Sequence, residues 1–586
     1  MENNYRLTNK EVVAILKEVL AAMEVKNVNI FKIRAYQNAI AVIDNLSNSV
    51  YDIWENKRLD EIPSIGTALA QHLNDLFTSG TSKEFEQVKF GLPEGMFSLI
   101  GIRGIGAKKA FKLAHAFKLV NREKAIEDIK ERALKGEIKV LDGFGEKSEK
   151  DILEAIEQMK LTKNEKPRTL LVIAEQVVER VIEHMHKCDQ VLKIDALGSF
   201  RRRNPTIGDL DFVVATNDPE KVMSHFLAFD EVSEVLVKGD KKVAVVLKND
   251  MQADLRVSAP QAYGAMLQYN TGSKQHNIVL RTYALDKGMS LNEYGIKING
   301  ENKEFATEEA FYKKLGLPPI PPELRHGANE VELASKNKLP KLIELKDIKG
   351  DCHTHTADSD GENNMEEMLT MASKLKYEYY GISDHAPSII NRGEEEVAQI
   401  LVEKRKRIDS FNKTHPNIKV FFGYEVNILA EAKLALPDEY LKMLDYVVAS
   451  IHTSFTQDRD QVTKRLVNAL ENPYVNIIGH PAGGLLNERD PIDPDWNKVF
   501  DAAKANNKIL EINAQPNRLD LSYDLVAEAI KRGIKIIINS DAHSINQLFN
   551  VKYGIDVARR GGCEAKDVIN TYSFEDFKKA VSLRNW

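Results

Sequence analysis

The sequence predicts a multidomain protein in which an all-helical N-terminal part is followed by a mixed α/β unit and a C-terminal α/β barrel. Three observations lead to this fold class. At 586 residues the chain is too long for a single hydrophobic core. Apolar residues recur three and four positions apart from Thr8 to about Lys160, which is typical of amphipathic helices. Beyond Lys349, short apolar runs alternate with helical patterns, which is typical of parallel strands joined by helices.

Composition places the protein among soluble globular chains. Apolar residues make up 43% and charged residues 29% of the sequence, and the formal net charge is −6. This charge disfavours coating of nucleic acid by bulk positive potential but allows local phosphate contacts. No apolar stretch reaches the roughly 18 residues that span a bilayer, and residues 1–10 lack the pattern of a secretion signal. We therefore expect a cytoplasmic protein without membrane contacts. The cysteines, which are Cys188, Cys352 and Cys563, lack CxxC spacing, so we expect neither disulfides nor a thiolate zinc site.

Three glycine-containing turns interrupt the helical part, and each is followed at once by a helix pattern: residues 62–66, 102–106 and 141–145. Such turns leave the first amides of the next helix free to bind a phosphate without reading a base. One turn alone is more often an ordinary helical hairpin, but three in one region favour binding to DNA. The turns resemble helix-hairpin-helix elements, which grip the DNA backbone. This resemblance implies two helical domains, residues 1–82 and 83–165, with DNA contacts at Gly66, Gly104, Gly106 and Lys108.

An acidic cluster is predicted in the middle of the chain. Asp209 and Asp211 are two residues apart in a strand-like run, so their carboxylates point to the same face. The runs KKVAVVLK and MQADLRVS form a predicted hairpin, and Asp254 on its second strand could complete the cluster. Three carboxylates suit Mg²⁺, which prefers a few carboxylates plus substrate phosphates. Two such ions could activate a 3′-hydroxyl and stabilise a leaving pyrophosphate.

The residues around this acidic pair carry a family resemblance. Gly198-Ser199 and Arg202 combine a turn with a cation, which suits a triphosphate, and with Asp-x-Asp they resemble the nucleotidyltransferase superfamily. The segment from Thr271 to Gly295 is similar to the nucleotide-selection region of DNA polymerase beta and its relatives. Roughly the first 320 residues thus resemble DNA polymerase family X. The resemblance implies a palm domain over residues 166–262 and a nucleotide-selection domain over residues 263–322.

The same resemblance assigns roles at the polymerase site. It implies that Asp209, Asp211 and Asp254 bind catalytic Mg²⁺ or Mn²⁺, with Asp254 as the base for the primer hydroxyl. It implies that Arg256 pairs with Asp211. The implied nucleotide-binding residues are Gly198, Ser199, Arg202, Gly208, Tyr269, Gly272 and Asn277. The residues implied to sense the template and the closure of the site on DNA are Arg281 and Tyr294.

Two positions depart from the family pattern. An aromatic pair is usual where this chain has Tyr269-Asn270, which bears on base stacking and on the exclusion of ribonucleotides. His72 stands where polymerase beta has a lysine that forms a Schiff base, and a neutral imidazole cannot form an imine. We therefore expect deoxyribose-phosphate lyase activity to be weak or absent.

Metal-type ligands follow the short apolar runs of the C-terminal part, which include YYGISDH, VFFGYEVN, VNIIGH and IKIIINSDAH. Parallel strands of an α/β barrel bring their C-terminal ends to one rim, so side chains distant in sequence converge there. The ligands predicted to meet are His353, His355, Asp360, His385, Glu425, His452, His480, Asp541 and His543. A proline-rich segment, residues 317–327, precedes them and is expected to form a stiff boundary with extended backbone. Residues 323–348 are expected to form a linker.

Residues 349–586 resemble the PHP domain, named for polymerase and histidinol phosphatase. The resemblance implies a distorted α/β barrel of seven strands that hydrolyses phosphate esters with up to three Zn²⁺, Mn²⁺ or Fe ions. It implies one ion held by His353, His355, Glu425 and Asp541, a second that shares Glu425 with His452 and His480, and a cluster completed by Asp360, His385 and His543. Imidazole and carboxylate ligands do not separate zinc from manganese.

The leading hypothesis is a family X DNA polymerase that fills short gaps in DNA repair and carries a PHP 3′–5′ exonuclease or related phosphoesterase. Its partners would be gapped or primed DNA and deoxynucleoside triphosphates, and we expect a monomer. Two alternatives stay open. One is a small-molecule phosphatase of the histidinol phosphate type with a DNA-binding N-terminal module. The other is a DNA-end scaffold whose polymerase is inactive.

Overall fold

The structure is a computed structural model of the 586-residue chain. It describes residues 7, 9–44, 50–55, 57–59, 62, 65–100, 102, 105–122, 124–141, 143–161 and 168–586. The chain divides into two compact units, Met1–Pro167 and Arg168–Trp586. Among the described residues, no helix has both the length and the apolar character that crossing a membrane requires.

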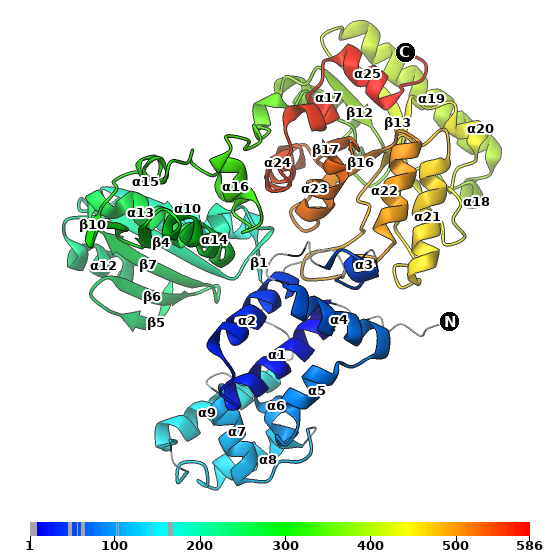
Figure 1. The fold of residues 1–586 in the computed structure, drawn as a ribbon. Coiled ribbons are helices and arrows are strands. Elements are labelled where there is room, and N and C mark those ends of the chain that lie inside the picture. The colour runs from blue at the N-terminus through cyan, green and yellow to red at the C-terminus, as the bar shows by residue number, and fades with distance from the viewer. Residues whose placement is uncertain are drawn as a thin grey trace. The chain divides into compact units, whose positions relative to one another are not determined.

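The first unit is helical, as the apolar periodicity predicts (Figure 1). Its described helices are α1 (Asn9–Val25), α2 (Ile30–Asp44), α3 (Val50–Glu55), α4 (Thr67–Ser79), α5 (Lys83–Lys89), α6 (Gly95–Leu99), α7 (Ala107–Ala116), α8 (Ala125–Leu134) and α9 (Glu146–Leu161). One core, around Leu16 and Phe77, joins α1 to α5. A second core, around Leu99 and Leu113, joins α6 to α9 and includes Ala22 of α1.

A five-stranded sheet of order β2-β4-β7-β6-β5 opens the second unit. The elements are β1 (Thr169–Leu170), α10 (Leu171–Met185), β2 (Lys193–Ala196), α11 (Gly198–Arg201), β3 (Thr206–Ile207), β4 (Asp209–Ala215), α12 (Pro219–Leu227), β5 (Val232–Lys238), β6 (Lys242–Leu247) and β7 (Gln252–Ser258). Strands β6 and β7 form the predicted antiparallel hairpin. Strands β4 and β7 are parallel neighbours, and their register sets Asp211 opposite Asp254. The sheet therefore brings together two acids that are far apart in the sequence.

A smaller subdomain follows the palm sheet. Its elements are η2 (Pro260–Ala262), α13 (Tyr263–Thr271), α14 (Lys274–Leu285), β8 (Met289–Asn292), β9 (Gly295–Ile298), β10 (Glu301–Lys303) and α15 (Glu308–Leu315). Helix α13 covers the face of the palm sheet where Val213 and Ala215 of β4 are buried against Tyr263 and Met266. This contact fixes the start of the subdomain against the strand that carries Asp209 and Asp211.

The segment expected to be a linker, residues 323–348, is packed rather than extended. It holds the end of η3 (Pro322–Leu324), α16 (Glu330–Ser335) and η4 (Leu345–Asp347). Arg325 is only 1% exposed, because its guanidinium donates to Glu308 Oε1 at 2.7 Å and to the Ile320 carbonyl. The buried ion pair anchors this segment to α15.

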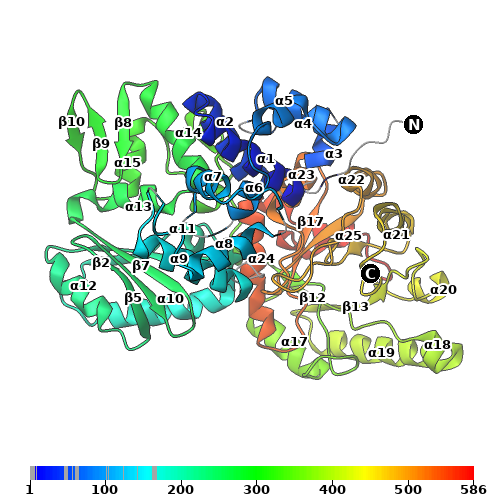
Figure 2. The ribbon, with the colours of Figure 1, turned by 90° about the horizontal axis from the view of Figure 1, so that it is seen from below.

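The C-terminal part is a barrel of seven parallel strands in sequential order, β11 to β17. Strands β12, β13 and β17 of this barrel are labelled in Figure 2. The strands are β11 (Gly350–Asp351), β12 (Tyr379–Ile382), β13 (Lys419–Asn427), β14 (Tyr446–Ser450), β15 (Ile477–Ile478), β16 (Ile509–Asn513) and β17 (Ile536–Asn539). Between and after them lie α17 (Met365–Lys374), α18 (Ile389–Arg392), α19 (Glu394–Thr414), α20 (Asp438–Leu441), α21 (Arg459–Glu471), α22 (Trp496–Ala505), α23 (Tyr523–Lys531), η5 (Gln547–Asn550), α24 (Val551–Arg560), η6 (Ala565–Asp567), η7 (Ile569–Thr571) and α25 (Phe574–Val581).

The barrel is nearly closed by contacts between its first and last strands. A parallel bridge joins Thr354 to Ala542, and Cys352 N donates to Asn539 Oδ1 at 3.0 Å. The predicted fold class is thus confirmed, including the seven-stranded barrel. One detail differs: the two-residue spacing of His353 and His355 predicts that both lie on one face of a strand, but β11 ends at Asp351 and both histidines follow it in the segment that closes the barrel.

Candidate active sites

The three predicted palm acids lie near the starts of the parallel strands β4 and β7. Asp209 is exposed at the start of β4, Asp211 is half-buried, and Asp254 is buried on β7. Both oxygens of Asp254 have partners, since Gln252 Nε2 donates to Oδ1 at 2.9 Å and Lys242 Nζ lies 2.5 Å from Oδ2. Sequence reasoning missed Lys242, whose place beside Asp254 follows from the β6-β7 register and not from any motif.

Electrostatics indicate that the palm acids form one charged site. Burial, followed by the neighbouring carboxylates of Asp209 and Asp254, raises the pKa of Asp211 to about 6. Arg256 opposes this shift in pKa through its charge, and its buried Nε has no hydrogen-bond partner. Such crowding of negative charge is relieved by a divalent cation, so the residues fit the expected metal.

Gly198 allows the nucleotide loop, residues 198–204, to approach these acids. Its φ is 60°, and a Cβ at this position would lie 2.5 Å from Asp211 Oδ2. The residues Gly198–Arg201 form the short helix α11 rather than the turn expected from the sequence, and Ser199 lies within it. Arg202 follows the helix and donates to the Thr271 carbonyl. Burial, followed by the charge of Arg560, lowers the pKa of Arg202 to about 10.

The other predicted nucleotide residues lie on α13 and α14 and at the start of β4. Asn277 Nδ2 donates to the Tyr269 carbonyl at 2.8 Å. Gly272 ends α13 with a φ of 65°, and a Cβ there would lie 3.2 Å from an Arg202 nitrogen. Gly208 is exposed just before Asp209.

The residues predicted to sense the DNA template are exposed. Arg281 lies on α14 with its guanidinium 5.3 Å from the centre of the Tyr269 ring. Tyr294 lies in the turn between β8 and β9, where Lys241 Nζ is 5.0 Å from its ring centre. Both side chains are therefore accessible to a large ligand.

The predicted DNA-binding glycines of the helical unit stand at helix starts. Gly66 and Gly106 precede α4 and α7 as extended N-cap residues, and no side chain caps either helix. A Cβ on either glycine would meet no atom within 4 Å. Lys108 is exposed, and its Nζ lies 3.1 Å from Asn27 Oδ1. Gly104 lies outside the described residues.

In the barrel, Glu425 at the end of β13 is surrounded by predicted ligands. Its Oε1 lies 2.9 Å from His480 Nε2, 3.0 Å from His452 Nε2 and 3.3 Å from His353 Nε2. Its Oε2 lies 3.1 Å from His385 Nδ1 and 3.6 Å from His355 Nε2. Burial opposes ionisation of Glu425, but the surrounding imidazoles outweigh it and hold the pKa of this carboxyl well below its usual range.

The remaining predicted ligands join the same cluster from two sides. Asp360 Oδ2 lies 3.3 Å from both His385 Nε2 and His543 Nε2. Asp541 Oδ1 lies 3.1 Å from His355 Nε2. The structure therefore brings together all of the sequence-predicted barrel ligands, which come from the ends of six strands.

Unsatisfied nitrogen atoms indicate that the cluster suits metal ions. Four buried ring nitrogens have no hydrogen-bond partner: His353 Nε2, His355 Nδ1, His355 Nε2 and His480 Nδ1. Leaving buried polar atoms unpaired costs about 1–3 kcal/mol each, which coordination to a metal would remove. Groups of three or four side chains offer ligand atoms within 4.8 Å of one another, as a multinuclear site requires.

Sequence reasoning missed Glu511, which supports this cluster from β16. Glu511 is fully buried, and its Oε1 accepts a hydrogen bond from His353 Nδ1 at 2.8 Å. Its Oε2 accepts from the His480 backbone N–H at 2.7 Å. A carboxylate only accepts hydrogen bonds, so it fixes the tautomer in which His353 Nε2 offers its lone pair to the centre.

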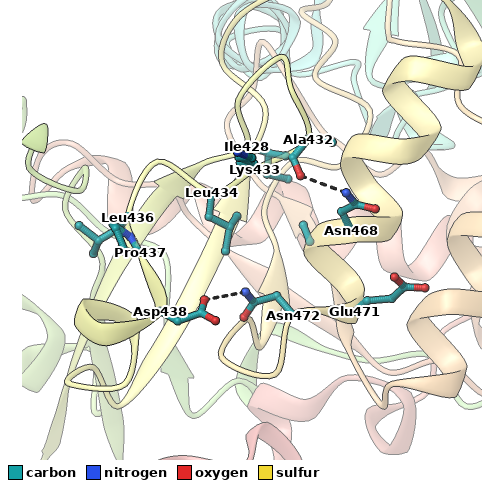
Figure 3. A pocket seen from close by; sticks show the side chains of 11 residues that line it. Ile428, Ala432, Lys433, Leu434, Leu436, Pro437, Asp438, Asn468, Glu471 and Asn472 are labelled. Carbon is teal, nitrogen blue, oxygen red and sulfur yellow. Dashed lines mark hydrogen bonds between the residues drawn. The ribbon is translucent and has the colours of Figure 1, made fainter. Parts of the chain in front are cut away.

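A surface pocket of the barrel is separate from this cluster (Figure 3). It lies between the loop after β13 and α21, where Asn472 Nδ2 donates to Asp438 Oδ1 at 3.0 Å. None of the predicted ligands lines it, so it adds nothing to the metal centre.

Family models match four parts of the chain. They are a helix-hairpin-helix domain at residues 7–82, a DNA polymerase beta palm at 167–280, a DNA polymerase beta thumb at 266–326 and a PHP domain at 351–515. With the palm acids and the histidine-rich barrel, they define the class of family X DNA polymerases that carry a PHP domain.

The relatives identify the family within this class. The chain is 34% identical over 571 residues to the DNA polymerase/3′-5′ exonuclease PolX of Bacillus subtilis, covering 97% of this chain and 98% of that protein. The chain belongs to the PolX family. Its C-terminal part is also 30% identical over 233 residues to a probable phosphatase of Thermoanaerobacter, covering 38% of this chain and 89% of that protein. A probable phosphatase of Acetivibrio thermocellus is 31% identical over 202 residues.

Proposed function

We propose that the chain extends primer 3′ ends in short DNA gaps at its palm site and removes nucleotides from 3′ ends at its PHP site. The observation that carries the proposal is that two distinct clusters of ligand-type side chains coexist in one chain, one of carboxylates and one rich in imidazole. Full-length similarity to a DNA polymerase/3′-5′ exonuclease supports the pairing of these activities. The substrates would be gapped or primed DNA and deoxynucleoside triphosphates.

At the palm, Asp209, Asp211 and Asp254 would hold Mg²⁺ or Mn²⁺. When bound, these ions neutralise phosphate charge and favour ionisation of the primer 3′-hydroxyl. Asp254 would take the hydroxyl proton. Arg202 and the residues of α11 would orient the triphosphate through charge-assisted and backbone hydrogen bonds.

At the barrel, the nine clustered side chains would hold up to three Zn²⁺, Mn²⁺ or Fe ions. Bound ions of this kind lower the pKa of water and neutralise phosphoryl oxygens. Glu511 would keep the His353 ring oriented, and Asn427 would do so for His452, whose Nδ1 lies 2.5 Å from Asn427 Oδ1. The resulting site would hydrolyse a phosphodiester at a DNA 3′ end.

A second candidate activity for the barrel is removal of a 3′-phosphate. Similarity of this half to proteins described as probable phosphatases favours it, because a phosphomonoester needs the same ligand chemistry. Release of inorganic phosphate from a 3′-phosphorylated primer would measure it directly.

The test uses a gapped duplex with Mg²⁺ or Mn²⁺ and three proteins: wild type, Asp254→Ala and His353→Ala. We expect Asp254→Ala to abolish extension while 3′ degradation persists, and His353→Ala to do the reverse. Extension that survives Asp254→Ala would contradict the assignment of the palm site. Loss of both activities in either variant would show that the sites do not act separately.

A further inference from the structure

Helix α24 of the barrel contacts the nucleotide loop of the palm, residues 198–204. Arg203 in this loop donates from Nε to Asp556 Oδ2 at 2.8 Å, and Asp556 lies in the middle of α24. The Arg203 side chain is 22% exposed and that of Asp556 13%, so the pair is largely shielded from water. Breaking an ion pair shielded in this way costs more than breaking a surface pair, because it leaves an uncompensated charge away from water.

Arg560, at the end of α24, binds the same loop a second time. Its Nη1 donates to the Arg202 carbonyl at 2.7 Å and to Asn204 Oδ1 at 2.6 Å. The backbone N–H of Asn204 in turn donates to the Ser199 carbonyl at 3.0 Å. A buried guanidinium from the barrel thereby holds the backbone of both residues assigned to the triphosphate, Ser199 and Arg202.

Further contacts fix α24 against the palm and against the barrel. Glu175 of α10 accepts from Lys552 Nζ at 2.9 Å and from Tyr553 OH at 2.7 Å, and it also binds Arg203. On its other side, α24 packs against β16 and β17, where a Cβ on Gly554 would lie 2.5 Å from Ile538 Cγ2. The helix is therefore a rigid support for the loop and not a mobile neighbour.

We propose that Asp556 and Arg560 are positioning residues for nucleotide binding, so that the barrel supplies part of the framework of the polymerase site. Neither is among the residues assigned to the metal ions or to the triphosphate, and their contacts are with Arg203, the Arg202 carbonyl and Asn204. They act by holding residues 198–204 in the conformation that receives the triphosphate, which lowers the cost of ordering the loop when nucleotide binds. This inference rests on the polymerase activity proposed above.

The test is steady-state filling of a one-nucleotide gap by Asp556→Asn and Arg560→Lys in the full chain. We expect the KM for the incoming nucleotide to rise about tenfold, with kcat changed by less than about twofold, because loop order is lost before the chemical step. Lysine keeps the charge of Arg560, but its side chain is one bond shorter than the path to Nη1, so its ammonium should not reach both the Arg202 carbonyl and Asn204 Oδ1. Degradation of a single-stranded primer 3′ end should stay at the wild-type rate.

Glu323→Gln is the matched control. Glu323 Oε1 accepts from Arg559 Nε of α24 at 2.8 Å, and Glu323 does not touch the nucleotide loop. The KM of the Glu323→Gln variant for the incoming nucleotide should therefore match that of the wild type. An unchanged KM in both Asp556→Asn and Arg560→Lys would overturn the proposal. So would an equal rise in KM for Glu323→Gln, or a parallel loss of exonuclease activity in Asp556→Asn. If either variant fails to fold, Arg203→Lys tests the same contact from the palm. Failure of the wild-type chain to extend would instead refute the polymerase function itself.

Discussion

Replacing Glu511 by glutamine tests the proposal that the barrel cluster holds metal ions. Each carboxylate oxygen serves two donors: Oε1 binds His353 Nδ1 and Asn539 Nδ2 at 2.8 Å, and Oε2 binds the His480 N–H at 2.7 Å and Asn513 Nδ2 at 3.3 Å. In either orientation, the new NH₂ group would face two donors. Where it faces His353, the ring must shift its proton to Nε2, which removes that lone pair from the centre.

The expected cost follows from these contacts. Loss of an outer partner of a ligating histidine lowers metal affinity about 10- to 100-fold, which corresponds to about 1.4–2.7 kcal/mol. We therefore expect Glu511→Gln to lose metal at a chelator concentration about 10- to 100-fold lower than wild type does. Its exonuclease rate should fall at limiting metal, while gap filling stays unchanged.

The assay is elemental analysis after chelator titration, with exonuclease and gap-filling rates measured on the same samples. Glu378→Gln is the control, since Glu378 is an exposed carboxylate on the barrel that pairs with Lys349 at 3.2 Å. If the metal content and chelator sensitivity of Glu511→Gln lie within twofold of the wild-type values, the reasoning is refuted. If Glu511→Gln loses gap filling as much as it loses exonuclease activity, the variant is unfolded as a whole.

Three further predictions concern the polymerase half. The pKa of Asp211 is raised from 3.8 to about 6 on folding, so stability is lost as pH rises between these values and the loss is complete above about 6. Metal-free Asp211→Asn should therefore be up to about 3 kcal/mol more stable than wild type at pH 7 in thermal unfolding; a lower Tm would contradict this. Stabilisation of the wild type by Mg²⁺ should weaken as pH falls through about 6, where Asp211 takes up a proton, and a Tm increase that is independent of pH would exclude this. Glu308→Gln leaves the buried Arg325 uncompensated and should cost about 3 kcal/mol in urea unfolding, whereas exposed Glu309→Gln should cost almost nothing.

Much of this architecture could be predicted because it depends on local periodicity. Two-residue spacing set Asp209 and Asp211 on one face, and the placement of histidines after apolar runs predicted their convergence at one rim. Both patterns can be read within a few residues of sequence.

Other features depend on partners that are distant in the chain. Glu511 sits inside a buried strand, and its partner His353 is 158 residues away, so no local motif marks it. The prolines before Arg325 suggested an extended linker, but the burial of that arginine against Glu308 decides the conformation. The contact of Asp556 with Arg203 joins residues 353 positions apart. Long-range pairing of charges therefore escapes a reading based on periodicity.

Closure of the barrel has a consequence for the lifetime of the protein. The first and last strands meet through the Thr354–Ala542 bridge, with His353 and His355 on one side and Asp541 and His543 on the other. An ion shared across this seam would act as a cross-link between the two ends of the domain, much as a disulfide does in a secreted protein. Without such an ion the seam would depend on the bridge and hydrogen bonds alone, so the metal-free barrel would unfold more readily and be degraded sooner.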